Sequence, residues 1–278
     1  MNIQMRAIGA LNPLFQATNW VDVLESGDQQ KILAATQKSG EVVLSQFYGY
    51  NDLTNKVVLD FGCGSAGKTL YYARQGAAVT YGVDVSIDYA GTAIEQARAL
   101  GLEFHISRIT PDNGIPLPDA SIDVVLSSSV LEHLSDLDRS LAEVRRVLKP
   151  GGLFLNRWHP YQTRFGSHLN SIIGIPFAHR LFSEKALMAF YYDSMVARHG
   201  HVPAAVASIS RDGELNDIMY MNRIRPQDAH RAFARGGFDM KALRYFRGMK
   251  EQTWARNAPE ALKLLGADYE VNVLQKKA

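Results

Sequence analysis

Five short apolar runs, separated by stretches of helical character, occupy residues 56–156 and limit what this part of the chain can form. The runs are VVLDF (57–61), VTYGVD (79–84), LEFHI (102–106), IDVVLSS (122–128) and LFLN (153–156). Near-continuous apolar runs of this length are typical of parallel strands that are buried on both faces. Because parallel neighbours need crossover helices, the alternation predicts a doubly wound α/β sheet with right-handed connections.

Two of the intervening segments carry recognisable helix boundaries. Ser86 is a candidate N-cap for a helix that ends at Gly101, and Ser135 or Asp136 is one for a helix that ends before Pro150-Gly151-Gly152. Short polar side chains accept hydrogen bonds from the first helical turn, and glycine permits the left-handed residue that often ends a helix. Both helices are therefore predicted to connect successive strands.

The strand–helix rhythm stops after the fifth run and returns near the end of the chain. A helix is predicted over 226–235, because Gly236-Gly237 can end it, and a strand is predicted over 241–246. The segment YEVNVL (269–274) alternates apolar and polar residues, as an antiparallel strand does. The sheet is thus expected to resume after an insertion.

These patterns predict one Rossmann-like core with two additions. The core is expected to comprise residues 56–156 and 216–278, in a mostly parallel sheet with one antiparallel C-terminal strand. Residues 1–55 are predicted to form an N-terminal helical lid, and 157–215 an inserted substrate cap. The apolar segment 169–182 is expected to pack over the substrate beneath this cap, with an oligomer interface or a membrane surface as alternatives.

Composition limits the partners and the compartment. The 278 residues include 30 basic and 28 acidic side chains, and a net charge of +2 gives no reason to expect a nucleic-acid partner. The one cysteine, Cys63, excludes an intramolecular disulfide. We find no secretory signal and no apolar stretch near the roughly 20 residues of a spanning helix. The sequence therefore predicts a cytoplasmic protein without a transmembrane segment.

The segment LDFGCGSAGKT (59–69) matches two incompatible ligand-binding motifs. From Gly62 it satisfies both the phosphate loop G-x-x-x-x-G-K-[ST] and the nucleotide-binding turn G-x-G-x-x-G. Asp60 precedes Gly62 by two residues, where its carboxylate would repel a polyphosphate and attract a cation. The segment therefore favours a cationic ligand without phosphates, such as S-adenosylmethionine, which carries a sulfonium and an ammonium group.

A second acidic residue supports this interpretation. Asp84 ends the second apolar run about 20 residues after the glycines, where a carboxylate hydrogen-bonds ribose hydroxyls. A phosphate-loop NTPase also needs a magnesium-binding aspartate after a later strand, but the run at 122–128 is followed by Ser129 and has Asp123 at its opposite end. An NTPase and a dinucleotide dehydrogenase are therefore minor alternatives.

Four segments, in order and at the spacing of a known family, resemble the class I S-adenosylmethionine-dependent methyltransferases: VVLDFGCGSAG, VTYGVDVS, IPLPDASIDVVLSSSVLEHL and EVRRVLKPGG. The most similar branch is that of the ubiquinone- and menaquinone-type small-molecule enzymes. The resemblance implies that eight residues bind the cofactor: Asp60, Gly62, Gly64, Gly67, Asp84, Val85, Ser128 and Ser129. This chain has SRIT (107–110) where many relatives carry an acidic residue that contacts the adenine amino group.

Methyl transfer from a sulfonium requires alignment of acceptor, methyl and sulfur, and a base only where the acceptor must lose a proton. His133 and His159 follow the fourth and fifth strands, where ligands of doubly wound sheets bind, and are candidate catalytic residues. Each can instead be structural. Four further residues with charged or ring side chains are candidates for acceptor binding: Arg157, Tyr161, Arg164 and His168.

Five of the eight histidines lie in 157–215, but they lack the i, i+4 pair of a helical zinc site, so no metal is predicted. The sequence predicts methyl transfer to a small molecule or glycan intermediate, with oxygen favoured as the acceptor atom. Methylation of nitrogen or carbon is the alternative. An S-adenosylmethionine-binding protein without transferase activity is the alternative from another class.

Overall fold

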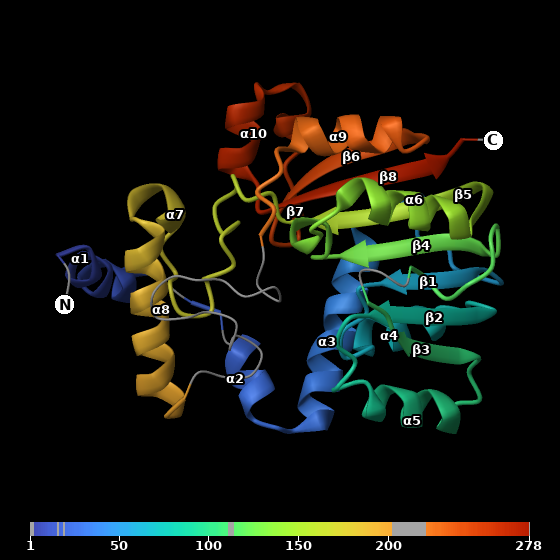
Figure 1. Ribbon diagram of the computed structural model, residues 1–278, viewed down its shortest axis with the longest axis horizontal. Coiled ribbons are helices and arrows are strands. Elements are labelled where there is room, and N and C mark those ends of the chain that lie inside the picture. Colours follow the sequence, from blue (N-terminus) through green and yellow to red (C-terminus); the bar gives the residue numbers. More distant parts are fainter. Residues whose placement is uncertain (1–2, 16, 19, 111–113, 202–220, 278) are drawn as a thin grey trace.

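An eight-stranded sheet in the order β3-β2-β1-β4-β5-β8-β6-β7 forms the centre of the molecule (Figure 1). The structure is a computed structural model that describes residues 3–15, 17–18, 20–110, 114–201 and 221–277. Its strands are β1 (Val57–Phe61), β2 (Val79–Asp84), β3 (Phe104–Arg108), β4 (Ile122–Ser128), β5 (Leu148–Trp158), β6 (Phe238–Arg247), β7 (Lys250–Glu251) and β8 (Tyr269–Lys276).

Strands β1 to β5 run parallel to one another, whereas β8 is antiparallel to both β5 and β6. This confirms the predicted doubly wound sheet that is mostly parallel with an antiparallel C-terminal strand. The two-residue β7 adds only a short antiparallel ladder to β6. The strand order reverses between β1 and β4, so the connections after these neighbouring strands leave toward opposite faces, which opens a crevice at their carboxyl ends.

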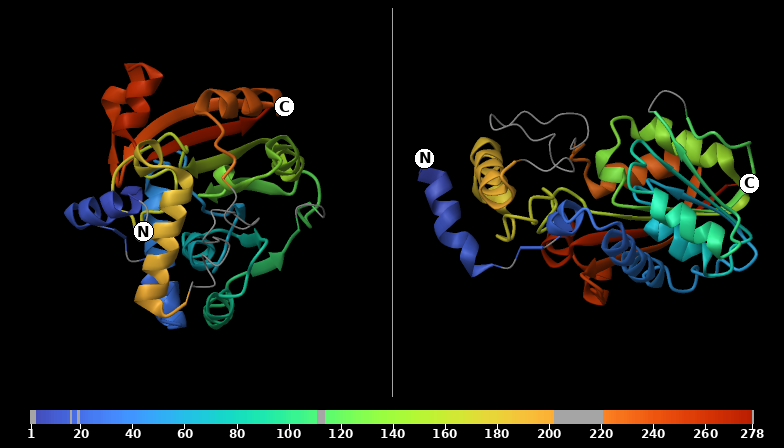
Figure 2. Two further views of the ribbon diagram at one scale, coloured as in Figure 1. Left: turned by 60° about the vertical axis from the view of Figure 1, so that its left-hand side comes forward. Right: turned by 90° about the horizontal axis from the view of Figure 1, so that it is seen from below.

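Helices cover both faces of the sheet (Figure 2). The α-helices that the structure describes are α1 (Ile3–Leu11), α2 (Trp20–Glu25), α3 (Gln29–Ser45), α4 (Gly67–Ala73), α5 (Gly91–Ala99), α6 (Leu137–Val147), α7 (Ala178–Leu181), α8 (Glu184–His199), α9 (Pro226–Arg235) and α10 (Glu260–Gly266). Helices α6 and α9 pack on one face in a core that includes Leu59 and Trp158. Helices α3, α4 and α5 pack on the other face, where Val58 and Leu155 are buried.

The strand bounds agree with the sequence where the apolar run is bounded by turns, and differ elsewhere. The runs 57–61, 79–84 and 122–128 are strands with these bounds, and 153–156 is the middle of the longer β5. The predicted strand 102–106 begins instead at Phe104. The reason is local: Leu102 N donates to Ala97 O at 3.0 Å, so Leu102 completes the end of α5 before β3 starts.

One of the predicted helix caps is confirmed and another is wrong. Asp136 caps α6, because its side chain accepts a hydrogen bond from Arg139 N at 2.9 Å. Ser86 does not cap α5, which begins five residues later at Gly91. The Ser86 hydroxyl donates to Asp88 Oδ2 at 2.8 Å, and this side-chain bond holds a turn between β2 and α5. The predicted helix at 226–235 is α9.

A helical layer formed by α1, α7, α8 and residues 159–177 lies beyond the carboxyl ends of the parallel strands (Figures 1 and 2). Its core contains Ile8 from α1 together with Ile173, Leu187 and Tyr191. Most aliphatic side chains of the apolar segment 169–182 are buried in this core. The predicted end of the insertion at 215 lies outside the described residues. Within the described residues, no helix combines the length and the apolar character needed to cross a bilayer.

Candidate functional site

The register of the sheet brings the sequence-predicted residues to one edge. Phe61, at the end of β1, pairs with Val83 of β2 on one side and Ser127 of β4 on the other, and Ser128 pairs with Arg157 of β5. The segments that follow these strands therefore start side by side. They are the glycine loop, the Asp84 turn, the Glu132-His133 turn and the start of the insertion.

The glycine loop turns sharply at the end of β1, and its backbone is anchored to β2. Gly62 N and Cys63 N both donate to Val83 O, at 2.8 and 3.1 Å. Gly62 and Gly64 have φ of 83° and 52°, in the left-handed region that favours glycine. A Cβ on Gly62 would lie 2.0 Å from Val130 Cγ2, whereas one on Gly64 would meet nothing within 4 Å. The loop therefore packs on the turn after β4 at Gly62 and faces open space at Gly64.

Gly67 has a different role from the other two glycines. A Cβ built there would lie 1.8 Å from Thr36 Oγ1 and 3.2 Å from Leu33 O, both on α3. The absence of a side chain thus lets α4 approach α3 closely. This contact explains the third glycine of the motif by helix packing.

Asp60 lies beneath the loop and is fully buried. Its Oδ2 accepts a hydrogen bond of 2.6 Å from Thr69 Oγ1 on α4, and its Oδ1 has no hydrogen-bond partner among the described residues. Burial raises the pKa of this carboxyl, and the nearby Lys68 charge opposes the rise. The Asp60 carboxylate therefore lies buried beneath the loop, held by the Thr69 hydroxyl, and its role in cofactor binding stays a prediction.

The Asp84 carboxylate, and not that of Asp60, contacts the backbone of the glycine loop. Its Oδ2 accepts from Gly64 N at 2.8 Å and its Oδ1 from Ser86 N at 2.9 Å, so one carboxylate braces two turns. The residue is only partly buried, and its neighbour Val85 is 53% exposed. A carboxylate oxygen has a second lone pair, so Asp84 can still accept hydrogen bonds from a ligand.

Arg157 and the two predicted serines form a buried polar group at the ends of β4 and β5. Arg157 Nη1 donates to Ser128 Oγ at 3.2 Å, and Ser129 N donates to Arg157 O at 2.9 Å. The guanidinium carbon lies 3.3 Å from the centre of the Tyr269 ring. Stacking on the Tyr269 ring and the hydrogen bond to the Ser128 hydroxyl hold the Arg157 guanidinium at the edge of the crevice.

Three histidines predicted separately come together beside Glu132. His133 ends the short helix η2 (Leu131–His133), His159 follows β5, and the rings of both lie close to His168, at centroid distances of 5.1 and 5.0 Å. Glu132 Oε1 accepts from His159 N at 3.2 Å and lies 3.5 Å from His168 Nε2. We call these four residues the histidine cluster. Sequence reasoning missed Glu132, although it directly precedes His133.

Burial determines the charges in the histidine cluster. It raises the pKa of Glu132 from 4.5 to about 7. Burial, together with the nearby His133 side chain, lowers the pKa of His168 to about 3, and burial also lowers that of His159 well below its usual range. His168 is therefore neutral near pH 7, so its approach to Glu132 is not an ion pair. Glu132, His133 and His168 each place one potential ligand atom within 4.8 Å of the others, which is compatible with a metal ion.

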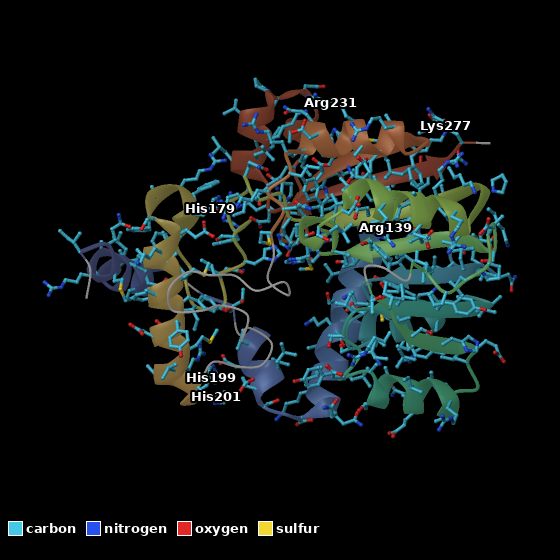
Figure 3. The ribbon with its side chains drawn as sticks, viewed as in Figure 1. Arg139, His179, His199, His201, Arg231 and Lys277 are labelled. Carbon is cyan, nitrogen blue, oxygen red and sulfur yellow. The ribbon has the colours of Figure 1, made fainter. Side chains whose placement is uncertain are left out.

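The other histidines of the insertion lie elsewhere. Figure 3 shows His179 on α7, and His199 and His201 at the end of α8 that is farther from α7. His201 Nε2 lies 2.9 Å from a Glu25 carboxylate oxygen, which ties the end of α8 to α2. The histidine spacing within the insertion does not reveal the cluster, because His133 lies outside that segment.

The remaining predicted acceptor residues differ in their freedom to bind a ligand. Arg164 donates from Nε and Nη2 to the two carboxylate oxygens of Asp268, at 3.0 and 2.9 Å. This bidentate pair occupies the edge of the guanidinium that carries Nε and Nη2, so these donors support the fold and are not available to an acceptor. Tyr161 is half-buried, with the His179 ring and the Arg223 guanidinium packed around it.

Replacing Glu132 by glutamine tests the effect of its burial. The Glu132 carboxyl loses its proton near pH 4.5 in the unfolded chain and near pH 7 in the folded protein. Its contribution to stability is therefore present at low pH and is lost as the pH rises through this window. The variant has no such loss. We expect it to exceed the wild type in free energy of unfolding by up to about 3 kcal/mol at pH 8, and by little at pH 4. Urea unfolding at several pH values, with a chelator present, measures this; a constant difference would contradict it.

Comparison with known proteins agrees with the geometry. Residues 59–156 match the family model of the methyltransferase domain. Methyltransferase GfsG of Streptomyces halstedii is 32% identical over 117 residues, which cover 41% of this chain and 42% of that protein. The fatty-acid O-methyltransferase of Mycolicibacterium smegmatis is 37% identical over 105 residues, which cover 37% of each chain. The chain thus matches less than half the length of either relative.

The relatives differ in the atom that they are named for methylating. They include a ubiquinone biosynthesis O-methyltransferase of Rhizobium leguminosarum, 36% identical over 34% of this chain and 37% of that protein. Others are named as a sterol 4-C-methyltransferase and an ajmaline N-methyltransferase. A solved S-adenosylmethionine-dependent methyltransferase from Mesorhizobium loti shares the fold, with a TM-score of 0.51 and 19% identity over 81% of this chain and 93% of that one.

The sheet order, the glycine loop and the matched family model together define the class of this region. Residues 59–156 match the model of the methyltransferase domain, and the fold is Rossmann-like, as in the solved S-adenosylmethionine-dependent methyltransferase.

Proposed function

We propose that the protein transfers the methyl group of S-adenosylmethionine to an oxygen atom of a small molecule or glycan intermediate. This proposal rests on one observation: a glycine loop anchored by hydrogen bonds lies at the same edge of the sheet as the histidine cluster. The loop suits the cofactor, and the cluster suits an acceptor that must lose a proton. S-adenosylmethionine, when bound, supplies an activated methyl group and leaves as S-adenosylhomocysteine.

Two features of the loop support the binding of this cofactor. Gly64 faces open space, so a ligand can approach its backbone, and the partly exposed Asp84 carboxylate can accept hydrogen bonds from ribose hydroxyls. Val85 exposes an apolar surface suited to the adenine. Gly62, Gly67 and Asp60 would support this site from behind, while Ser128 and Ser129 would close it beside β4.

His159 is the best-placed base of the histidine cluster. Its Nδ1 is buried and has no hydrogen-bond partner among the described residues, and burial keeps the imidazole neutral. In the proposed reaction the acceptor oxygen attacks the methyl carbon as the carbon–sulfur bond breaks, and His159 Nδ1 takes the hydroxyl proton. His133 would orient the acceptor. Arg157 and Tyr161 would contact its polar or flat groups, and His168 would contribute from the insertion.

The helical layer supports a role in enclosing the acceptor. We infer that residues 157–215, together with the N-terminal helices of 1–55, act as the cap and lid of the site, because α1, α7 and α8 lie beyond the carboxyl ends of the strands. Helix α3 packs on one face of the sheet and anchors the N-terminal segment there. Enclosure would exclude water from the reacting atoms. The names of relatives support quinone-type phenols and fatty acids as the first acceptors to test.

The test has two stages, which separate the proposal from a binding protein without activity. S-adenosylhomocysteine should bind to the purified protein in calorimetry, and methyl-deuterated S-adenosylmethionine should label a phenolic or carboxylic acceptor in mass spectrometry. Binding without labelling of any acceptor in a broad panel would favour the non-catalytic alternative. Labelling on nitrogen or carbon would support methyl transfer and contradict the choice of oxygen.

Replacing His159 by alanine should separate catalysis from cofactor binding. Removal of a general base lowers kcat by about 10²–10⁴-fold, and S-adenosylhomocysteine affinity should not change because His159 lies outside the glycine loop. Steady-state kinetics with the labelled acceptor measures the first effect and calorimetry the second. His201→Ala is the matched control, because His201 is exposed at the far end of α8 and should retain wild-type kcat. An unchanged kcat in His159→Ala would refute the assignment of the base.

A further inference from the structure

We propose that Glu132, His133 and His168 form a binding site for one divalent transition-metal ion. The site stands on its own geometry, while its role in methyl transfer rests on the proposed function. Two imidazoles and one carboxylate are common metal ligands, and these three come from the turn after β4 and from the insertion. The fold thus brings together ligands that are 35 residues apart in the sequence.

The distances suit a single ion after small side-chain movements. The potential ligand atoms lie within 4.8 Å of one another. An ion that binds nitrogen and oxygen at about 2.0–2.2 Å holds its ligand atoms roughly 3–4 Å apart. Side-chain rotations that move the ligand atoms by roughly 1 Å would bring them into this range.

Two buried polar atoms lack the partners that an ion would provide. Glu132 is 1% exposed, and its Oε2 has no hydrogen-bond partner among the described residues. His168 Nε2 is likewise buried and has no hydrogen-bond partner in the described part of the chain. Native structures rarely leave such atoms unsatisfied, because each one forgoes the hydrogen bonds that it made with water. Both atoms lie in a cluster that offers three ligand atoms, so a shared cation accounts for them together.

The backbone around the ligands is held in place. Asn222 Nδ2 donates to Leu131 O and Leu134 O, at 2.7 and 3.0 Å, and Asn222 N donates to Glu132 O at 2.9 Å. Glu132 Oε1 is fixed by the hydrogen bond from His159 N, which leaves Oε2 as the free ligand atom. Such supporting contacts orient ligands in metal sites.

The ligand types indicate the class of ion. Mixed nitrogen and oxygen ligands without thiolate suit Mn²⁺, Fe²⁺, Co²⁺ or Zn²⁺, whereas Mg²⁺ and Ca²⁺ prefer oxygen alone. Three protein ligands leave coordination positions open. An acceptor hydroxyl bound there would lose its proton more readily, and the proton would pass to His159 Nδ1 as the oxygen attacks the methyl group.

The experiment uses Mn²⁺ and Zn²⁺, each alone, titrated by calorimetry into the full-length, chelator-treated protein without cofactor. We expect one ion per chain in the wild type for at least one of the two metals. Affinity should fall at least about 100-fold in Glu132→Gln and in His168→Ala, since each loses a direct ligand. His201→Ala should bind as the wild type does, and it excludes His201 and the neighbouring His199 as the source of the signal.

Several results would overturn the metal site. These are the absence of stoichiometric binding of both ions, equal affinity in the wild type and both ligand variants, or loss of binding in His201→Ala. Glu132→Gln keeps the shape of the side chain and should remain folded, so one informative variant survives if His168→Ala does not fold. S-adenosylhomocysteine binding is measured separately. Its failure would count against the proposed function and leave the metal result standing.

Discussion

Asp84→Ala should bind S-adenosylhomocysteine at least about 100-fold more weakly than the wild type. The variant loses the acceptor that holds Gly64 N at 2.8 Å and Ser86 N at 2.9 Å, together with the proposed bonds to the ribose. Hydrogen bonds to a charged group contribute about 1.5–3 kcal/mol each, and about 1.4 kcal/mol corresponds to a tenfold change in affinity. Loss of two such bonds therefore accounts for the expected fall in affinity, which calorimetry measures directly.

The matched control for this variant is Asp88→Ala. Asp88 belongs to the same turn, but it is exposed and bonds Ser86 Oγ and Arg108 instead of the glycine loop. Its replacement should leave affinity for S-adenosylhomocysteine within about threefold of the wild type, an estimate based on the small effect of exposed ion pairs. Equal losses in both variants would mean that the turn as a whole, and not the Asp84 carboxylate, supports binding.

Gly67→Ala should reduce the free energy of unfolding by at least about 2 kcal/mol, because its new methyl group must displace α3 from α4. The ideal Cβ lies 1.8 Å from Thr36 Oγ1, and Thr36 is buried and hydrogen-bonded to Ile32 O and Leu33 O, so it has little room to move. Gly64→Ala should lose only about 1 kcal/mol from its positive φ, yet impair cofactor binding because its methyl group enters the open side of the loop. Urea unfolding and calorimetry measure the two effects.

Two further variants test the reason for the Gly67 effect. Gly91 begins α5 and has no heavy atom within 4 Å of an added Cβ, so Gly91→Ala should be neutral or slightly stabilising. Adding Thr36→Ala to Gly67→Ala removes the closest clashing atom and should restore part of the lost stability. A double variant no more stable than Gly67→Ala would contradict the steric explanation.

The core could be predicted from the sequence because its signals are local. The apolar runs of β1, β2 and β4 end at turn residues, and the glycines of the loop adopt the positive φ that the motif requires. The start of β3 could not be predicted from the apolar pattern. Leu102 is apolar, as a strand residue would be, but its backbone N–H donates to Ala97 O and so completes the end of α5. Spacing alone cannot separate the loop contact of Gly64 from the helix contact of Gly67, since both fit the same motif.

The candidate site was predictable residue by residue but not as an arrangement. His133, His159 and His168 could each be selected by type and position, but their proximity depends on the path of an insertion without a regular period. The orientation of Asp60 depends on Thr69, one turn into the next helix, whose hydroxyl competes with any ligand for the carboxylate. Arg164 was misjudged for a similar reason, because Asp268 lies 104 residues further along the chain.

The contact between α1 and α8 has a consequence for the order of folding. Gln4 Oε1 accepts hydrogen bonds from the backbone and hydroxyl of Ser183, 179 residues away. On the ribosome the first helix emerges long before its partner has been synthesised, and contacts of such separation close late because loop entropy must be overcome first. We therefore expect α1 to remain undocked in the nascent chain until α8 has left the exit tunnel.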